Sequence, residues 1–259
     1  MAQRGAERVG QTRGESEVMS QGNPRDHCPH ALIGPALDRW SECHWHLHQM
    51  EAHYHQPDAF RYALNSFIRA LKEVPQILKM AIQNEKGLKE LIRPELTDLE
   101  SSALFKQLSK TRNYLVHQGM LELESTGSAG TVEGRKLKIS FPFKVAPWES
   151  SEEAYVRYKQ VCRTDKFMRS LIGPDCDSCP AIWRTWVISD FPGRDLLEVA
   201  FEAWRKLGVV LSAAVTARGG EALDLSMPCR HDPQLVMVKV FSQRDFFLEV
   251  DDLDISLQD

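Results

Sequence analysis

The strongest constraint on the fold is a wide apolar stripe of helical period between residues 58 and 87. Such spacing indicates a long amphipathic helix whose apolar face packs in a helical core. Asp58 is the predicted N-cap and Gly87 the predicted end. Pro75 is expected to kink this helix, or to end one helix and begin another. The stripe consists of Phe60, Leu64, Phe67, Ile68, Leu71, Leu78 and Ile82.

Three further segments have helical patterns. The first runs from Pro35 to about His55 and is rich in histidine. The second is expected to follow a turn at Arg93–Pro94, to begin at Thr97 or Asp98, and to end at a left-handed Gly119. Its predicted buried row is Leu104, Leu108, Thr111 and Leu115. The third begins at Asp195 and stops at Gly219–Gly220, with Leu196, Ala200, Ala203, Leu207, Val210 and Ala214 facing inward.

The remaining segments predict a small amount of β structure. Residues 121–145 are Gly-rich and then alternate, which indicates a β-hairpin or two short strands with Pro142 at an edge or bulge. Residues 150–170 are expected to be helical and residues 172–180 to form a turn. Residues 235–250 suggest a strand or a pair of strands. The fold class is therefore mainly α: a helical bundle with a small β-hairpin insertion and a short C-terminal β element.

Composition and charge narrow the class of protein. Residues 1–30 lack a hydrophobic period and are expected to be a disordered leader. A helical domain should span 31–217, with the insertion at about 121–190, and residues 218–259 should hold a strand segment and an acidic tail.

With no export signal or membrane-spanning run, and six scattered cysteines, the chain is expected in the cytoplasm, away from membranes. A net charge of −4 disfavours a protein that coats nucleic acid, whereas an enzyme needs only a local basic patch.

Arg112, Asn113 and His117 form the constellation with the clearest chemistry. They lie at the end of the predicted helix that Gly119 closes. A guanidinium can bind a phosphate through two parallel hydrogen bonds, and a histidine can donate or accept a proton. Asn113 can hold an oxygen or orient its neighbours. This set suits cleavage of RNA by its own 2′-hydroxyl, a reaction that needs acid–base groups and charge stabilisation but no metal.

The spacing of the arginine and the histidine is weak evidence by itself, because it occurs three times in the chain. The pairs are Arg25/His30, Arg39/His44 and Arg112/His117. Only the third has an asparagine after the arginine and a glycine stop at the end of an amphipathic helix. A structural reading also stays open, in which Arg112 is a paired surface residue and His117 caps a helix.

The segment FRYALNSFIRALKEVPQIL, followed by FKQLSKTRNYLVHQG, resembles the HEPN family (higher eukaryotes and prokaryotes nucleotide-binding). The resemblance covers residues 35–120 and extends to the helix at 195–217. It implies a helical bundle and a metal-independent endoribonuclease of defence or toxin type. In such enzymes two copies of the Arg-Asn-x3-His motif face each other in a homodimer, and no cofactor is required. Arg112, Asn113 and His117 are then the catalytic candidates, with Lys110 and Lys106 as candidate RNA-binding residues.

The chain departs from one pattern of that family. Toxins silenced by a nucleotidyltransferase partner often carry a tyrosine two residues after the histidine, where this chain has Gly119. Modification at that position is excluded, and an antitoxin partner of that type is disfavoured, although another regulatory partner stays open. A HEPN fold that binds RNA or a nucleotide without cutting it is the main alternative function.

Several other histidines, cysteines and basic residues have both a structural and a functional interpretation. The histidines His44, His48 and His55 share one stripe of the first helix, which is either a polar face or a zinc site. Cys176 and Cys179 have the spacing of half a zinc knuckle, whose other half would be Cys162, or Cys229 with His231. The tryptophans Trp183, Trp186 and Trp204 are expected in the core. Basic residues on the helices around the motif are solvated or line an RNA path; they are Arg61, Arg69, Lys72, Lys79, Lys106 and Lys110.

Overall fold

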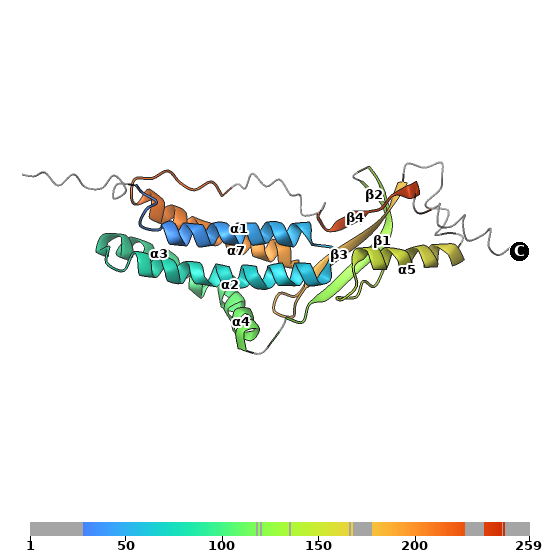
Figure 1. Ribbon diagram of the computed structural model, residues 1–259, viewed down its shortest axis with the longest axis horizontal. Coiled ribbons are helices and arrows are strands. Elements are labelled where there is room, and N and C mark those ends of the chain that lie inside the picture. Colours follow the sequence, from blue (N-terminus) through green and yellow to red (C-terminus); the bar gives the residue numbers. More distant parts are fainter. Residues whose placement is uncertain are drawn as a thin grey trace, which may run out of the picture.

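The computed structural model describes residues 28–117, 119, 121–134, 136–165, 167, 178–225, 236–244 and 246. The expected leader up to residue 27 and the acidic tail lie outside these residues. Four long helices form one end of an elongated molecule and a four-stranded sheet forms the other (Figure 1). The mainly helical fold class is thus confirmed, with a small antiparallel sheet of which three strands precede the last long helix in the sequence and one follows it.

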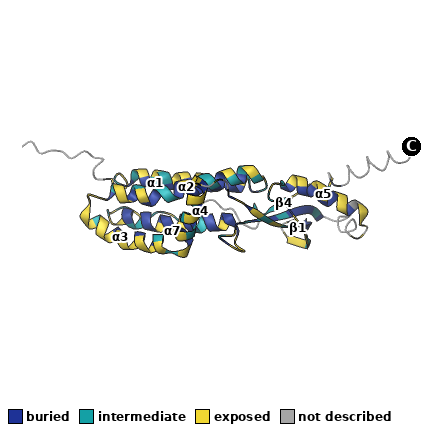
Figure 2. Ribbon diagram, turned by 90° about the horizontal axis from the view of Figure 1, so that it is seen from below, coloured by how far each residue is buried: buried dark blue, intermediate teal, exposed yellow. Residues whose placement is uncertain are grey.

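The bundle is built on α1 (Gly34–Ala52), α2 (Pro57–Ala81), α3 (Lys86–Ser101) and α7 (Leu196–Thr216). All seven members of the predicted stripe are buried, as are all six predicted inward residues of α7. The predicted bounds of the helix are wrong, because α2 begins at Pro57, before Asp58, and ends at Ala81, whereas Gly87 lies inside α3. Buried residues lie on the inner faces of the helices and exposed residues on their outer faces (Figure 2). Pro75 lies inside α2, which continues without interruption to Ala81. Asp195 caps α7 as predicted, since its carboxylate accepts a hydrogen bond from the Leu197 N–H at 2.9 Å.

Two tryptophans hold α1 against α7. The rings of Trp40 and Trp204 are stacked at 4.2 Å, and each indole N–H donates to the backbone carbonyl of the other residue. Gly208 is required beside them, because a Cβ there would lie 2.8 Å from the Trp40 ring. The predicted core position of Trp204 is confirmed, and so is that of Trp186, whereas Trp183 is only partly buried.

The predicted turn at Arg93–Pro94 is wrong, because Pro94 lies within α3. A proline removes one backbone hydrogen bond, while buried Ile92, Leu96 and Leu99 hold the helix against the core on both sides of it. Thr97 does not cap a helix either; its hydroxyl donates to the Arg93 carbonyl inside α3. The break occurs at Ser102, whose backbone is extended and whose hydroxyl accepts the Phe105 N–H.

The sheet has the antiparallel order β2-β1-β3-β4. The predicted hairpin is β1 (Glu124–Glu133) with β2 (Lys136–Pro142), and Pro142 ends the edge strand. The helix α5 (Ser151–Thr164), with a capping box at Ser150, packs its apolar face on this sheet and forms a second, smaller core. At the C-terminal end only β4 (Val238–Val240) is observed within the described residues.

The strand β3 (Ser178–Val187) lies where the sequence indicated a turn and then no regular element. Residues 172–177 of that expected turn lie outside the described residues, whereas Ser178–Pro180 belong to the strand. Its central residue, Arg184, is fully buried, so the segment lacks the apolar alternation that would reveal a strand. The guanidinium lies over the Trp186 ring and donates to Ser125 and to the Ala146 carbonyl. Burial lowers the pKa of Arg184 to about 10, which Glu149 partly opposes.

Candidate functional site

The motif lies on α4 (Ala103–His117), which projects from the bundle below α2 (Figure 1). All four predicted inward residues of this helix are buried, together with Phe105, and α4 packs against α2 and α3. Helical geometry then turns the opposite face of α4 toward solvent. Asn113 and His117 lie on that face and are exposed, while Arg112 is partly buried at its border.

His117 is the last residue of α4, and Gly119 closes the helix behind it. The Gly119 N–H donates to the Tyr114 carbonyl at 3.2 Å, which is the bond that ends many helices at a glycine. Its φ of 137° favours glycine. The predicted stop is therefore confirmed, and it leaves the His117 side chain at the free end of the helix.

A cavity of about 570 Å³ opens at this end of α4. Lys110, Asn113 and His117 line one wall, and the segments that precede β1 and follow β3 line the other. That second wall contributes Leu121, Glu122, Ile188, Ser189 and Asp190. The Thr111 hydroxyl donates to the Asp190 carboxylate at 3.0 Å, which joins the two walls. The cavity thus combines a cation, an amide, an imidazole and two carboxylates.

Arg112 and Lys106 do not line this cavity. Arg112 is 140° around the helix from His117. Within the part of the chain that the structure describes, its guanidinium makes one long hydrogen bond, 3.5 Å, to the Asn113 side chain. It lies on the side of Lys72, whose pKa is lowered by burial and by the charges of Lys79 and Arg112. Within one chain the structure therefore brings Lys110, Asn113 and His117 together and leaves Arg112 on an adjacent face.

Four cavity residues, Tyr114, Glu122, Ser189 and Asp190, were missed by the sequence reasoning. Tyr114 lies inside the motif and was read as a spacer. Glu122 and Asp190 come from connections far apart in the chain, and no local pattern marks them. Only the pairing of β1 with β3 brings their segments to the same end of the sheet.

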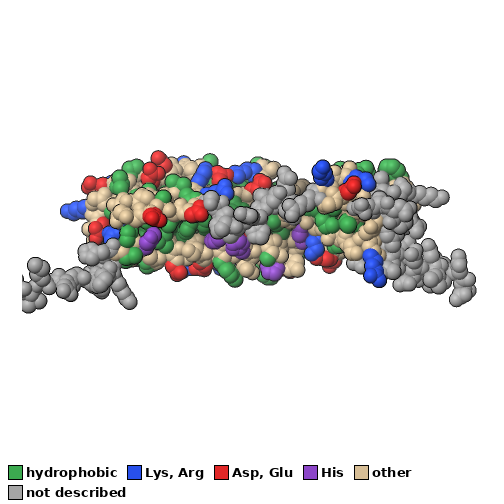
Figure 3. All heavy atoms as spheres, turned by 90° about the horizontal axis from the view of Figure 1, so that it is seen from above, with side chains coloured by type: hydrophobic (Ala, Val, Ile, Leu, Met, Phe, Trp, Pro, Cys, Tyr) green, Lys and Arg blue, Asp and Glu red, His purple; other side chains and the backbone are tan. Residues whose placement is uncertain are grey.

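The proposed zinc ligands, two on α1 and His55 in the turn after it, are engaged elsewhere. His44 stacks on Trp204, and His48 contacts the Glu51 carboxylate at 3.0 Å. Both ring nitrogens of His55 have partners, the Ser151 hydroxyl and the Val236 carbonyl, and burial lowers the pKa of His55 to about 4. Figure 3 shows histidine side chains spread along the face of the molecule seen from above. Among the described residues, no group of three or more His, Cys, Asp or Glu is placed to hold a metal ion.

The cysteine pair is only partly described. Cys179 lies in β3, whereas Cys176, Cys229 and His231 are outside the described residues. Cys162 is buried in α5, and burial raises the pKa of its thiol to about 11. The knuckle interpretation stays a prediction, because three of its five candidate ligands lie outside the described residues.

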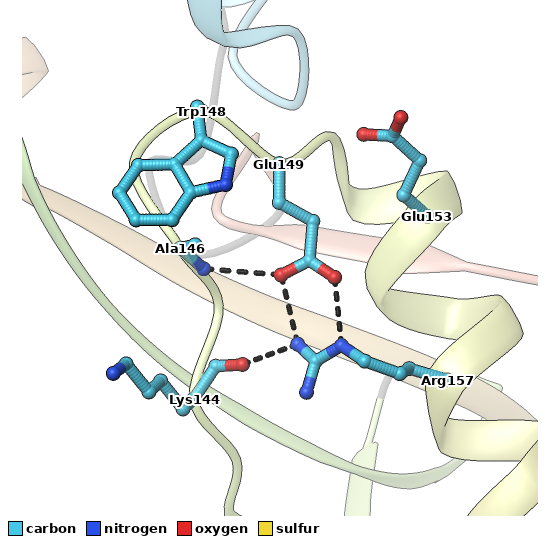
Figure 4. Close-up of a pocket in the computed structure, with 6 residues that line it drawn as sticks. All are labelled: Lys144, Ala146, Trp148, Glu149, Glu153 and Arg157. Atoms are coloured by element: carbon cyan, nitrogen blue, oxygen red, sulfur yellow. Dashed lines mark hydrogen bonds and ion pairs between the residues drawn. The ribbon is translucent and has the colours of Figure 1, made fainter.

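A second cavity, of about 420 Å³, lies between the end of β2 and α5 (Figure 4). Arg157 binds both oxygens of Glu149 at 2.8 Å and also the Lys144 carbonyl. Burial raises the pKa of Glu149, but its hydrogen bonds with Arg157 and the Ala146 N–H outweigh this and lower it. Because the arginine and the carboxylate satisfy each other, this arrangement holds the loop before α5 in place.

The fold and the cavity define a mainly helical protein with an exposed polar site at the end of a short helix. None of the described helices has the length and apolar character needed to cross a lipid bilayer. Residues 21–234 match the family model described as bacteriophage lambda protein ea47. The chain belongs to this family. Searches of curated proteins and of solved structures found no significant match.

Proposed function

We propose that this protein is a metal-independent endoribonuclease of toxin or defence type that uses Arg112, Asn113 and His117. One observation carries the proposal: Asn113 and His117 are exposed and line the same cavity as Lys110. A histidine that only stabilised the helix end would not need a cavity or a neighbouring lysine. A cleavage site needs both, because substrate must reach the imidazole and its phosphate must meet a cation.

The reaction follows from the chemistry of these side chains. A base removes the proton of a ribose 2′-hydroxyl, the 2′-oxygen bonds to the adjacent phosphorus, and the bond from phosphorus to the 5′-oxygen breaks. His117 donates a proton to that leaving oxygen, or accepts the 2′ proton in its neutral form. Arg112 and Lys110 stabilise charge on the phosphate oxygens. The products are a 2′,3′-cyclic phosphate and a free 5′-hydroxyl.

A homodimer completes the site in this proposal. Because Arg112 lies outside the cavity of its own chain, a second copy supplies the guanidinium that faces His117. Tyr114 and Val116, on the same helix, are exposed apolar residues that such an interface would cover. Without a second copy, the cavity would lack the guanidinium of Arg112. The chain would then fit the alternative better, a module that binds RNA or a nucleotide without cutting it.

The purified protein is expected to cut single-stranded RNA in the presence of EDTA and to leave cyclic phosphate ends. A matched RNA with a single 2′-deoxyribose at the cleavage position should stay intact there, because the attacking oxygen is missing. Gel analysis of labelled RNA with mass spectrometry of the ends checks both results. Cleavage of the deoxy-substituted bond, or binding of RNA without any cleavage, would contradict the proposed reaction; the second outcome would favour the binding module.

A further inference from the structure

A third cavity, of about 320 Å³, lies between α2 and α3, away from His117. Three cations line it, Lys79, Lys89 and Arg93, against one carboxylate, Glu100. The Glu100 carboxylate is paired with Lys79, whose Nζ lies 2.7 Å from each of its two oxygens. Lys89 and Arg93 are exposed and have no ion pair with any residue that the structure describes. The cavity therefore offers two uncompensated positive charges.

The positive charge continues from this cavity to the motif. Lys72 lies seven residues before Lys79, which is two turns along the same face of α2 and about 10 Å. Its ammonium donates to the Ser109 hydroxyl of α4 at 2.6 Å. Ser109 lies three residues before Arg112 on α4, so Lys72 and Arg112 flank the same turn of that helix. Burial, Lys79 and Arg112 lower the pKa of Lys72, whereas Glu100 raises it, so one carboxylate acts on Lys72 together with these cations. We name this row of five cations the basic track; its members are Arg93, Lys89, Lys79, Lys72 and Arg112.

A polyanion fits the basic track better than a small anion does. Phosphate alone would engage only the cavity and would not reach Lys72 and Arg112. A single-stranded nucleic acid carries charges at regular intervals and has bases with apolar faces. Ile82 and Leu96 line the same cavity but are buried, so its accessible lining is mainly charged and polar. A row of cations of this kind is typical of sites that hold the backbone of a single strand.

We propose that the basic track binds the sugar–phosphate backbone of single-stranded RNA and leads it to Arg112. This inference rests on the proposed function for the identity of the polymer. It adds a binding surface on α2 and α3 that includes Lys89 and Arg93, which no sequence pattern indicated. The scissile phosphate then lies at one end of the track, and the α2–α3 cavity holds a more distant part of the strand.

Fluorescence anisotropy with labelled oligouridine longer than about 16 nucleotides tests the basic track. All proteins carry His117→Ala, so that the RNA stays intact during the measurement. The variant Lys89→Glu with Arg93→Glu should bind roughly tenfold more weakly, and the slope of log affinity against log salt should fall by about 1.4. Lys89→Ala with Arg93→Ala should show a smaller loss in the same direction and serves if the first variant does not fold.

The matched control is Lys136→Glu with Lys144→Glu, which changes the net charge equally at exposed positions of the sheet end. Its affinity should stay within about twofold, because neither lysine belongs to the basic track. Equal weakening by both double variants would overturn the proposal, since overall charge would then explain binding. Unchanged affinity of the Lys89 and Arg93 variants would also overturn it, while cleavage by the wild-type protein would leave the proposed function standing. Selective weakening without any wild-type cleavage would uphold the track and reject the catalytic proposal.

Discussion

Replacing His117 with alanine is expected to lower the rate of RNA cleavage by about 100-fold or more. Histidine is the one residue type of the motif that can both donate and accept a proton in the reaction. It lies exposed at the end of α4, and alanine preserves a helix well. The affinity for RNA should change little, because Lys110 and Arg112 remain. Single-turnover cleavage in EDTA, with binding measured separately by anisotropy, gives both quantities.

His30→Ala is the matched control for this variant. His30 is exposed and has the same spacing from an arginine, Arg25, but it lies outside the cavity at the end of α4. Its cleavage rate should equal that of the wild type. If His117→Ala kept full activity while His30→Ala lost it, the motif would have been assigned to the wrong histidine. Full activity of both variants would remove histidine from the mechanism altogether.

Asp195→Ala is expected to give the largest loss of stability, about 3–5 kcal/mol. Asp195 is buried where the bundle meets the sheet. Its carboxylate accepts hydrogen bonds from the Tyr54 hydroxyl and from the N–H groups of Trp186 and Leu197. Burial raises the pKa of Asp195, which these hydrogen bonds oppose. Alanine would leave buried donors without an acceptor and remove the cap of α7.

The expected change in melting temperature is about 10 °C, measured by thermal unfolding at neutral pH. Asp195→Asn, which keeps an acceptor for part of the network, should lose less. Asp58→Ala is the control, because Asp58 also lies in the first turn of a helix but is exposed and pairs only with Arg61. Its melting temperature should change by a small fraction of that amount. Equal changes for Asp58 and Asp195 would show that this network does not join the bundle to the sheet.

The helices could be predicted from the sequence because their buried faces recur with helical spacing. The stripe on α2, the row on α4 and the inward face of α7 required only the positions of apolar residues. The end of α4 at Gly119 could be predicted equally well, since few residues other than glycine adopt that backbone conformation. Local pattern and tertiary burial agree at these positions, and such agreement is what makes a sequence readable.

The errors occurred where a tertiary contact overrode a local signal. Pro94 suggested a turn, but the core contacts of α3 hold a helix through it, and an unremarkable serine at 102 marks the actual break. The strand β3 was missed because Arg184 replaces an apolar residue at its buried centre. Its charge is stabilised by hydrogen bonds to Ser125 and Ala146, which are distant in the sequence, and by the ring of Trp186 on the same strand.

The candidate site was only half visible in the sequence. The motif identified one wall of the cavity, including Asn113 and His117. The opposite wall, with Glu122 and Asp190, depends on how the sheet returns to the end of α4. Arg112 and His117 are 140° apart around the helix, and of the two only His117 lines the cavity of its own chain. This separation gives the proposed dimer a specific role.

The central claim is that two copies of the motif build one cleavage site. Its most direct test mixes Arg112→Ala with His117→Ala, either by co-expression or by refolding the two variants together. Each variant alone should be inactive. In a mixed dimer, one of the two sites receives an intact Arg112 and an intact His117, so an equal mixture should recover about one quarter of wild-type cleavage. No recovery, although mass spectrometry shows that mixed dimers have formed, would contradict a site shared between two subunits.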